Sequence, residues 1–123
     1  MVIGIGVDIV DIERIRAALE NPKTGRRFRD RVFTEGEIAY CDRRRRAYES
    51  FAARFAAKEA TIKALGQSAG WQEIEVSRGA EGPPEVRLHG RARQRAEELG
   101  IRRVLLSLSH SEKMAIAYVV AES

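Results

Sequence analysis

The feature that most constrains the fold is one long alanine-rich segment, "ESFAARFAAKEATIKAL", at residues 49–65. Its apolar residues recur at helical spacing, so we expect a helix that ends at Gly66, a residue suited to a left-handed terminator. At about 3.6 residues per turn, Glu59 and Lys63 fall near the middle of an arc flanked by apolar residues. The pattern therefore predicts that a carboxylate and an ammonium group face the apolar side of this helix.

Charges in such a position need compensation. The ordinary interpretation of Glu59 and Lys63 is an i,i+4 ion pair, but that interpretation predicts an outward-facing pair. A bound divalent cation is an alternative, because two carboxylates completed by water and phosphate oxygens are typical of magnesium bound with its substrate. In that alternative Asp8 and Glu59 could supply the carboxylate ligands, and Lys63, one turn after Glu59, could reach a phosphate.

The second carboxylate is expected from the opening strand, "VIGIGVDIV". Its alternation places Ile3, Ile5, Val7 and Ile9 on one face and Gly4, Gly6 and Asp8 on the other. Asp8 alone reads as an ordinary turn or helix cap. Two glycines on its face, however, allow another backbone or a ligand to approach closely, which a cap does not require.

The remaining pattern combines helices and hairpins. Asp11 is a plausible N-cap of a helix, and "FTEGE" predicts another helix that begins with a capping box of Thr34 and Glu37. Beyond residue 66 the apolar period changes from 3.6 to 2. This predicts two hairpins separated by a short helix, at residues 71–88, 91–99 and 103–122, with the tip of the first hairpin in "SRGAEGPP". We expect an α+β fold, one compact domain over residues 1–123 with a mostly antiparallel sheet and a long central helix.

Composition narrows the class of protein. The net charge is +4, and the arginines cluster at 26–31 and 43–46, which favours a polyanionic partner. A non-catalytic module that binds nucleic acid would explain this charge. It would not explain the Glu59–Lys63 pair or the glycines beside Asp8, and the chain lacks the aromatic–basic interleaving of an RNA-binding surface, so we expect no nucleic-acid partner.

Several observations favour a cytoplasmic protein. No segment approaches the roughly 18 apolar residues of a membrane span, so we expect no membrane insertion. The N-terminus carries no basic leader or cleavage site of a signal peptide. Cys41 is the only cysteine, which excludes an internal disulfide and fits a reducing compartment.

His110 lies in the segment "SLSHS", at the mouth of the second predicted hairpin. A lone strand histidine is more often a packed, hydrogen-bonded residue than a functional one. The small hydroxyl side chains around it are nevertheless suited to phosphate contact. The sequence contains no phosphate-binding Walker loop, zinc-ligand spacing or complete G-x-G-x-x-G motif.

Four motifs together carry a family resemblance. They are "GIGVDIVDIERI" at 4–15, "FTEGE" at 33–37, "RFAAKEA" at 54–60 with "KALG" at 63–66, and "SLSHS" at 107–111. In this order and spacing they strongly resemble the bacterial holo-acyl-carrier-protein synthases, the short single-domain 4′-phosphopantetheinyl transferases. The match runs from residue 4 to the C-terminal hairpin.

The resemblance implies a reaction: transfer of 4′-phosphopantetheine from coenzyme A to a serine of apo acyl carrier protein, with release of adenosine 3′,5′-bisphosphate. It implies a role in fatty acid biosynthesis, with a polyketide carrier protein as the open alternative. It implies Mg²⁺ bound by Asp8 and Glu59, and Mn²⁺ could replace it because both ions suit oxygen ligands. Lys63 would contact the pyrophosphate.

The resemblance also assigns binding residues. Coenzyme A would be held by Arg54, His110 and Arg45 or Arg46, with Ser111 beside the histidine. The acidic carrier protein would dock on Arg14, Arg26 and Arg27. Some family members have an aspartate where this chain has Ser111, so the base that activates the serine stays open among Glu59, a metal-bound water and Lys63.

Family members of this size are trimers with coenzyme A in clefts between protomers, and the resemblance implies the same assembly here. Larger relatives carry a third acidic ligand two residues after the aspartate. Val10 occupies that position in this chain, as in the short class. A coenzyme A or carrier-protein binding subunit without catalysis is the remaining alternative.

Overall fold

A computed structural model describes residues 1–67, 69–78 and 82–123 of the chain. Five α-helices, one 3₁₀ helix and five strands are described within these residues. In chain order they are β1 (Val2–Asp11), α1 (Ile12–Glu20), α2 (Gly25–Val32), α3 (Glu35–Asp42), α4 (Ala47–Leu65), η1 (Trp71–Glu73), β2 (Ile74–Arg78), β3 (Pro84–Leu88), α5 (Gly90–Leu99), β4 (Arg103–His110) and β5 (Met114–Glu122).

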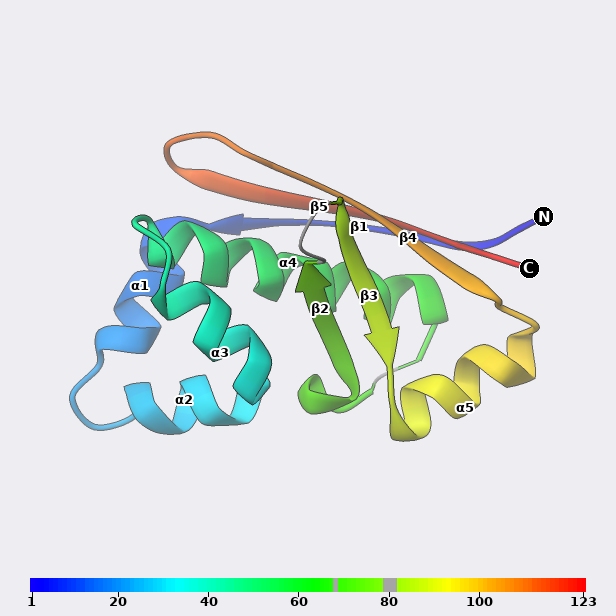
Figure 1. Cartoon of the computed structure of the whole chain (residues 1–123), viewed down its shortest axis with the longest axis horizontal. Helices are drawn as coiled ribbons and strands as arrows, with labels where there is room; N and C mark the ends of the chain where they lie inside the picture. The colour runs from blue at the N-terminus through cyan, green and yellow to red at the C-terminus, as the bar shows by residue number, and fades with distance from the viewer. Residues whose placement is uncertain (68, 79–81) are drawn as a thin grey trace.

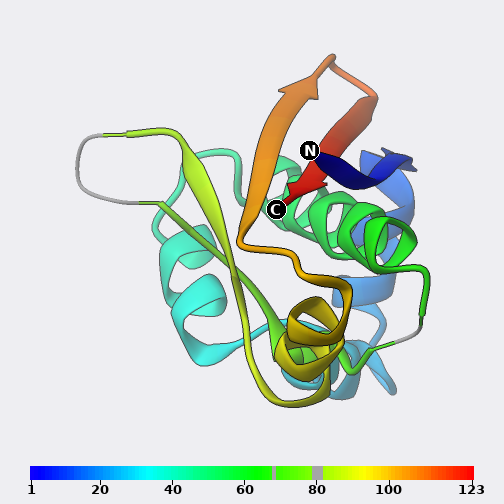
Figure 2. The ribbon, with the colours of Figure 1, turned by 90° about the vertical axis from the view of Figure 1, so that its right-hand side faces the viewer.

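The long helix α4 lies at the centre of the fold (Figure 1). An antiparallel sheet of strand order β1-β5-β4 covers one side of α4. The helices α1 to α3, the separate β2-β3 hairpin and α5 lie on the other side (Figure 1). Both chain termini lie close together at one end of the sheet (Figure 2), where the backbone N–H of Ser123 donates to the carbonyl oxygen of Met1 at 3.0 Å.

The two glycines of β1 allow that strand to pack directly on α4. A Cβ atom built on Gly6 would lie 1.8 Å from the carbonyl oxygen of Ala60, and one on Gly4 would lie 2.1 Å from that of Ala64. No side chain fits at such distances, so the prediction that a backbone approaches the glycine face is confirmed. Because alternate residues share a face of a strand, Asp8 continues this row along α4.

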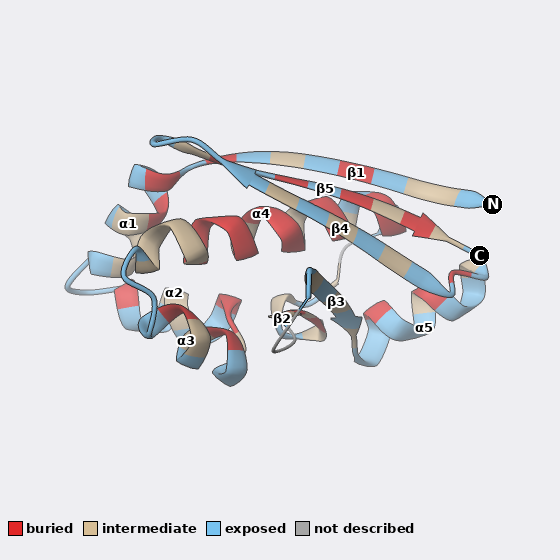
Figure 3. Cartoon of the chain, turned by 45° about the horizontal axis from the view of Figure 1, so that its top comes forward, coloured by how far each residue is buried: buried red, intermediate tan, exposed pale blue. Residues whose placement is uncertain are grey.

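The two faces of the three-stranded sheet differ sharply. The face toward α4 carries small or β-branched buried residues, at Ala115, Ala117, Val119 and Ala121 of β5. The outer face is apolar and exposed to solvent (Figure 3), and its exposed large residues are Ile5, Val7, Ile9, Leu105, Ile116 and Tyr118. Register places Ile5 and Leu105 on either side of Val120, and Val7 beside Tyr118, so these side chains form one continuous patch.

The buried charge of α4 is not the one that the sequence pattern predicted. Lys63 has a side chain that is 54% exposed and Glu59 is half-buried, so the expectation that this pair faces the apolar side was wrong. Alanines occupy the sides of α4 that are packed most tightly, because their small side chains allow the backbone of a strand to approach the helix. Phe55 and Ile62, which suggested the apolar arc, are only half-buried.

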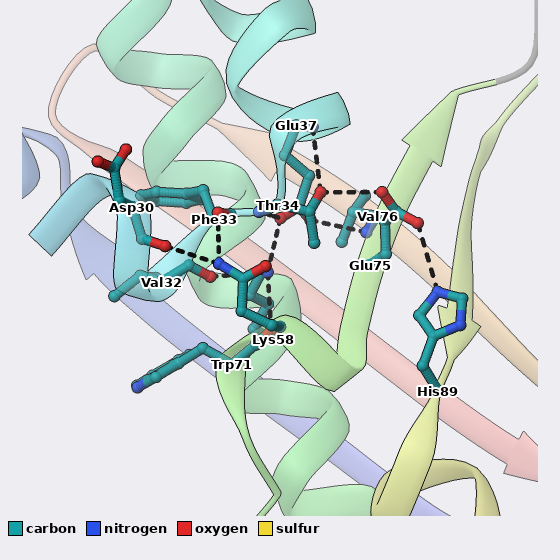
Figure 4. A network of polar contacts seen from close by, with 11 residues as sticks. Asp30, Val32, Phe33, Thr34, Glu37, Lys58, Trp71, Glu75, Val76 and His89 are labelled. Carbon is teal, nitrogen blue, oxygen red and sulfur yellow. Dashed lines mark hydrogen bonds and ion pairs between the residues drawn. The ribbon is translucent and has the colours of Figure 1, made fainter.

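The buried charges of α4 are Arg54 and Lys58, and Lys58 is buried completely. Figure 4 shows the surroundings of Lys58. Its Nζ lies 2.6 Å from Oε1 of Glu37, and neither side chain is exposed to solvent. The same ammonium donates to the carbonyl oxygens of Val32 and Trp71 at 2.8 and 2.9 Å. Burial lowers the pKa of Lys58, and the adjacent Glu37 carboxylate opposes that effect. Lys58 thus joins α4 to α2, α3 and η1.

Glu37 also completes the predicted capping box. Its Oε1 accepts the backbone N–H of Thr34 at 2.8 Å, and Oγ1 of Thr34 accepts that of Glu37 at 3.2 Å. Its second oxygen accepts the backbone N–H of Val76 in β2 at 2.8 Å. The capping box is therefore confirmed, with a buried Glu37 and a half-buried Thr34.

Most of the predicted elements are confirmed. Asp11 caps α1, and α4 and α5 end at Gly66 and Gly100 with φ of 69° and 76°. Both hairpins are present, but the first begins at Ile74 and not at Trp71, because Trp71–Glu73 form η1. Residues 79–81 of its predicted tip lie outside the described residues. The helix α2 was not predicted, because its arginine-rich sequence offers few apolar residues to show a period. In the described residues no helix is long and apolar enough to cross a membrane.

Candidate active site

Three predicted site residues come together where β1 crosses α4. The Nζ of Lys63 lies 3.3 Å from Oδ1 of Asp8 and donates to the carbonyl oxygen of Val7 at 2.9 Å. Glu59 projects from the preceding turn of the same helix, since residues four apart share a helix face. The structure thus confirms the expected juxtaposition of Asp8, Glu59 and Lys63, although it pairs Lys63 with Asp8.

The electrostatics of Glu59 reflect this placement. Burial raises the pKa of Glu59, the nearby Asp8 carboxylate raises it further, and the Lys63 ammonium acts in the opposite direction. Two carboxylates close enough to repel each other are stabilised by a cation between them. The arrangement therefore suits a positively charged ligand.

The donor set fits a hard divalent cation held jointly with a substrate. Among the described residues no group of three or more histidine, cysteine or acidic side chains forms a candidate metal cluster. Asp8 and Glu59 supply carboxylate oxygens only, which suits Mg²⁺ or Mn²⁺, ions that keep waters and take phosphate oxygens as further ligands.

A second group of predicted residues lines a cavity of about 830 Å³ on another part of the molecule. The cavity lies between the α3–α4 connection, the N-terminal half of α4, the start of β3 and strand β4. Arginines dominate its polar lining, and they are Arg43, Arg44, Arg45, Arg46, Arg54 and Arg78. Such a concentration of guanidinium groups favours a multiply charged phosphate ligand.

The predicted coenzyme A residues belong to this cavity with one exception. Arg45, Arg46, Arg54 and His110 all line it. Ser111 does not line it; its Oγ accepts the backbone N–H of Lys113 at 3.3 Å and of Met114 at 3.1 Å, which shapes the β4–β5 turn. Its role in coenzyme A binding stays a prediction.

Among the described residues, one carboxylate also lines the cavity. Glu49 lies 3.6 Å from Arg46 and 3.8 Å from Nδ1 of His110, so this carboxylate is close to two of the predicted binding residues.

The two groups lie on different sides of α4. Arg54 and Glu59 are five residues apart, which at about 100° per residue turns their side chains roughly 140° from each other. In the sheet, Asp8 belongs to edge strand β1 and His110 to the opposite edge strand β4, with β5 between them. None of Asp8, Glu59 and Lys63 lines the arginine-rich cavity.

The predicted docking arginines lie on the neighbouring helices α1 and α2. Arg14, Arg26 and Arg27 are all exposed. Arg14 has no carboxylate within 4.0 Å among the described residues, whereas Arg16 on the same helix is held by Glu13 and Glu20. The free charge of α1 is therefore concentrated at Arg14.

Sequence reasoning missed part of the cavity and the buried lysine. Tyr40 and Arg78 line the cavity but belong to no predicted motif, and Arg43 and Arg44 were predicted only as part of the basic cluster at 43–46. Lys58 lies in a helical stripe with Arg54, Ala57, Thr61 and Leu65, which are all buried. The polar Arg54 and Thr61 hide this stripe from a search for apolar spacing.

The whole chain is similar to known proteins. Residues 4–119 match the 4′-phosphopantetheinyl transferase superfamily. The holo-[acyl-carrier-protein] synthase of Desulforudis audaxviator is 48% identical over 98% of this chain and 93% of its own length. That of Solibacter usitatus is 40% identical over the full length of both chains.

The chain belongs to the holo-[acyl-carrier-protein] synthase family. Solved structures agree with this assignment. The synthase of Neisseria meningitidis superimposes with a TM-score of 0.85 at 36% identity, covering 100% of both chains. The synthase of Helicobacter pylori, solved in complex with coenzyme A, gives a TM-score of 0.81 at 30% identity, covering 96% of this chain and 99% of its own. The family resemblance and the α+β fold expected from the sequence are thus confirmed.

Proposed function

We propose that this chain acts as a magnesium-dependent holo-[acyl-carrier-protein] synthase with Asp8 and Glu59 as the metal-binding residues. The reaction is that of the family: 4′-phosphopantetheine passes from coenzyme A to a serine of apo acyl carrier protein. The observation that carries the metal assignment is the meeting of Asp8, Glu59 and Lys63 where the glycines of β1 allow it to pack on α4. Mn²⁺ is the alternative ion, since its ligand preference is the same.

The chemistry is a phosphoryl transfer. The serine oxygen bonds to the phosphorus on the pantetheine side of the pyrophosphate, the serine proton is released, and the anhydride P–O bond breaks to free adenosine 3′,5′-bisphosphate. When bound, the metal would offset negative charge on the pyrophosphate. Lys63 is placed to donate to the same group, because Asp8 and the carbonyl of Val7 hold its ammonium at the site.

The arginine-rich cavity is proposed to hold the adenosine end of coenzyme A and its 3′-phosphate. Arg45, Arg46, Arg54 and His110 are the binding residues, as the family resemblance implies. Because the metal-binding group lies on another side of α4, one molecule of coenzyme A is proposed to use Asp8, Glu59 and Lys63 of one copy and the cavity of a neighbouring copy.

A homotrimer would bring these two groups together in a closed ring. The outer face of the β1-β5-β4 sheet supports this assembly, since it leaves a continuous apolar patch exposed, with Ile5 at 58%. Large exposed apolar patches mark interaction sites. The free thiol of Cys41 is compatible with the cytoplasmic location that we propose.

Incubation with coenzyme A and Mg²⁺ is expected to add one phosphopantetheine to an apo acyl carrier protein. Sedimentation should give three times the chain mass.

Mixing two inactive variants tests the shared site. If the site is shared, protomers carrying Glu59→Gln and protomers carrying Arg54→Gln should form mixed trimers in which some sites are intact, and activity should return on mixing. Activity that stays absent after protomer exchange would contradict the shared site, while leaving the transferase assignment in place.

A further inference from the structure

Arg54 differs from the other cavity arginines in its burial. Only 5% of the residue is exposed, and its Nε is fully buried with no hydrogen-bond partner in the part of the chain that the structure describes. Among the described residues no carboxylate lies within 4.0 Å of its guanidinium group. The cavity carboxylate, Glu49, lies near Arg46 and His110 instead. A buried cation without a counter-charge is costly unless a ligand supplies one.

An aromatic ring holds Arg54 in place. Cζ of Arg54 lies 4.2 Å from the centroid of the Tyr40 ring, the distance of a close cation–π contact. Tyr40 is near the C-terminal end of α3, and its ring also lies 5.4 Å from Cζ of Arg44. The cationic surroundings affect the phenol too: burial raises the pKa of Tyr40, but Arg78, Arg44 and Arg54 outweigh burial and leave the pKa lowered.

A ring and a carboxylate would hold the guanidinium with different consequences. A carboxylate would occupy the N–H donors and cancel the charge. A ring binds the flat face of the guanidinium and leaves the donors at its edge free, with the charge intact. Tyr40 thus fixes the position of Arg54 while leaving it able to bind an anion.

The anion can be identified from what coenzyme A offers. Its pyrophosphate belongs with Asp8, Glu59 and Lys63 in the proposed function, which leaves the 3′-phosphate as the second anionic group. A phosphate monoester carries up to two negative charges and three acceptor oxygens, and it suits a cluster of forked donors.

We propose that Tyr40 is a positioning residue that holds Arg54 for the 3′-phosphate of coenzyme A and so sets the preference for 3′-phosphorylated nucleotides. This inference rests on the proposed function, because that function assigns coenzyme A to the cavity.

Direct binding tests the inference without carrier protein or transfer. Adenosine 3′,5′-bisphosphate and adenosine 5′-monophosphate would be titrated calorimetrically into the wild-type chain and its Tyr40→Leu, Tyr40→Phe and Arg54→Gln variants. We expect Tyr40→Leu to weaken binding of the bisphosphate about tenfold and that of the monophosphate less than about twofold. Tyr40→Phe keeps the ring and should retain the wild-type preference.

A double variant shows whether Tyr40 acts through Arg54. Adding Tyr40→Leu to Arg54→Gln should weaken bisphosphate binding no further, because the group that the ring positions is already gone. Tyr40→Gln serves as a second ring-deleting variant if Tyr40→Leu does not fold.

Three results would overturn the inference. Equal weakening of both nucleotides in the ring-deleting variants would mean that Tyr40 is only structural. Unchanged affinities would mean that its ring does nothing, and a loss in Tyr40→Phe as large as in Tyr40→Leu would assign the effect to the hydroxyl. Transfer by the wild-type chain, measured separately, reports on the proposed function alone.

Discussion

The carboxylate of Glu37 and the ammonium of Lys58 lie 2.6 Å apart with both side chains fully buried. Every donor of the ammonium is used, since the carbonyl oxygens of Val32 and Trp71 take the other two. Lys58 directly precedes Glu59, so this pair fixes α4 at the point from which the carboxylate that we propose as a metal ligand projects.

Loss of the Lys58 ammonium should therefore be strongly destabilising. Lys58→Met leaves Glu37 as a buried charge without its cation, and we expect the free energy of unfolding to fall by about 3–5 kcal/mol. The double variant Glu37→Gln/Lys58→Met should recover part of that loss, because it removes the uncompensated charge. Urea unfolding measures the free energy of unfolding of each variant. A value for Lys58→Met within about 1 kcal/mol of the wild-type value would refute the role of the pair.

The contact of β1 with α4 has its own test. Gly6→Ala would place a methyl group 1.8 Å from the Ala60 carbonyl oxygen, so the strand must move away from the helix. We expect a stability loss of at least about 1–3 kcal/mol and weaker metal binding, since Asp8 moves with the strand. Gly82→Ala is the matched control, because no atom of the described residues lies within 4 Å of the added Cβ. Similar melting temperatures for the two variants would disprove the tight packing.

Glu73 links stability to acid pH. Its carboxylate accepts the backbone N–H groups of Gly70, at 2.7 Å, and Arg91, and these bonds lower its pKa. A carboxyl with a lowered folded-state pKa stabilises the fold above its unfolded pKa, and this contribution disappears as the pH falls through the folded value.

Glu73→Gln should therefore cost about 1 kcal/mol at pH 7 and progressively less at pH values below about 4.5. Urea unfolding of both proteins from pH 7 to pH 3 would measure the difference. A difference that stays constant with pH would show that the charge of Glu73 is irrelevant.

The exposed Arg14 allows a test of carrier docking. Arg14→Glu should raise the KM for apo acyl carrier protein by about tenfold or more, because Arg14 belongs to the proposed docking surface. The KM for coenzyme A should stay within about twofold of the wild-type value, because Arg14 does not line the cavity. Arg102→Glu, in the α5–β4 connection at the other end of the molecule (Figure 1), makes the same change of charge elsewhere. Equal effects of the two variants, or equal losses for both substrates, would count against docking at Arg14.

Local sequence signals predicted the elements that hold the site. The caps at Asp11 and Thr34, the terminator at Gly66 and the period of each hairpin depend on neighbouring residues only, and all are present. The glycines of β1 were also informative, because a missing side chain implies a close neighbour whatever that neighbour is.

Burial around α4 was harder to predict from sequence. A helix that is covered on most sides has no single apolar arc. The large apolar residues Phe55 and Ile62 suggested such an arc, although the most buried positions of α4 are mainly alanines. The cavity was likewise only partly predicted, because Tyr40 and Arg78 reach it from α3 and β2, and no local pattern records which distant segments meet.

The most direct test of the central claim is the intact mass of an apo acyl carrier protein after incubation with coenzyme A, Mg²⁺ and this protein. The wild-type chain is compared with Glu59→Gln and with the control Glu98→Gln, which alters an exposed carboxylate of α5. We expect the wild type and the control to add one phosphopantetheine, a chelator to prevent the addition, and folded Glu59→Gln to lose at least about 100-fold in rate. Full activity of Glu59→Gln, or transfer that persists in the chelator, would contradict the metal site at Asp8 and Glu59.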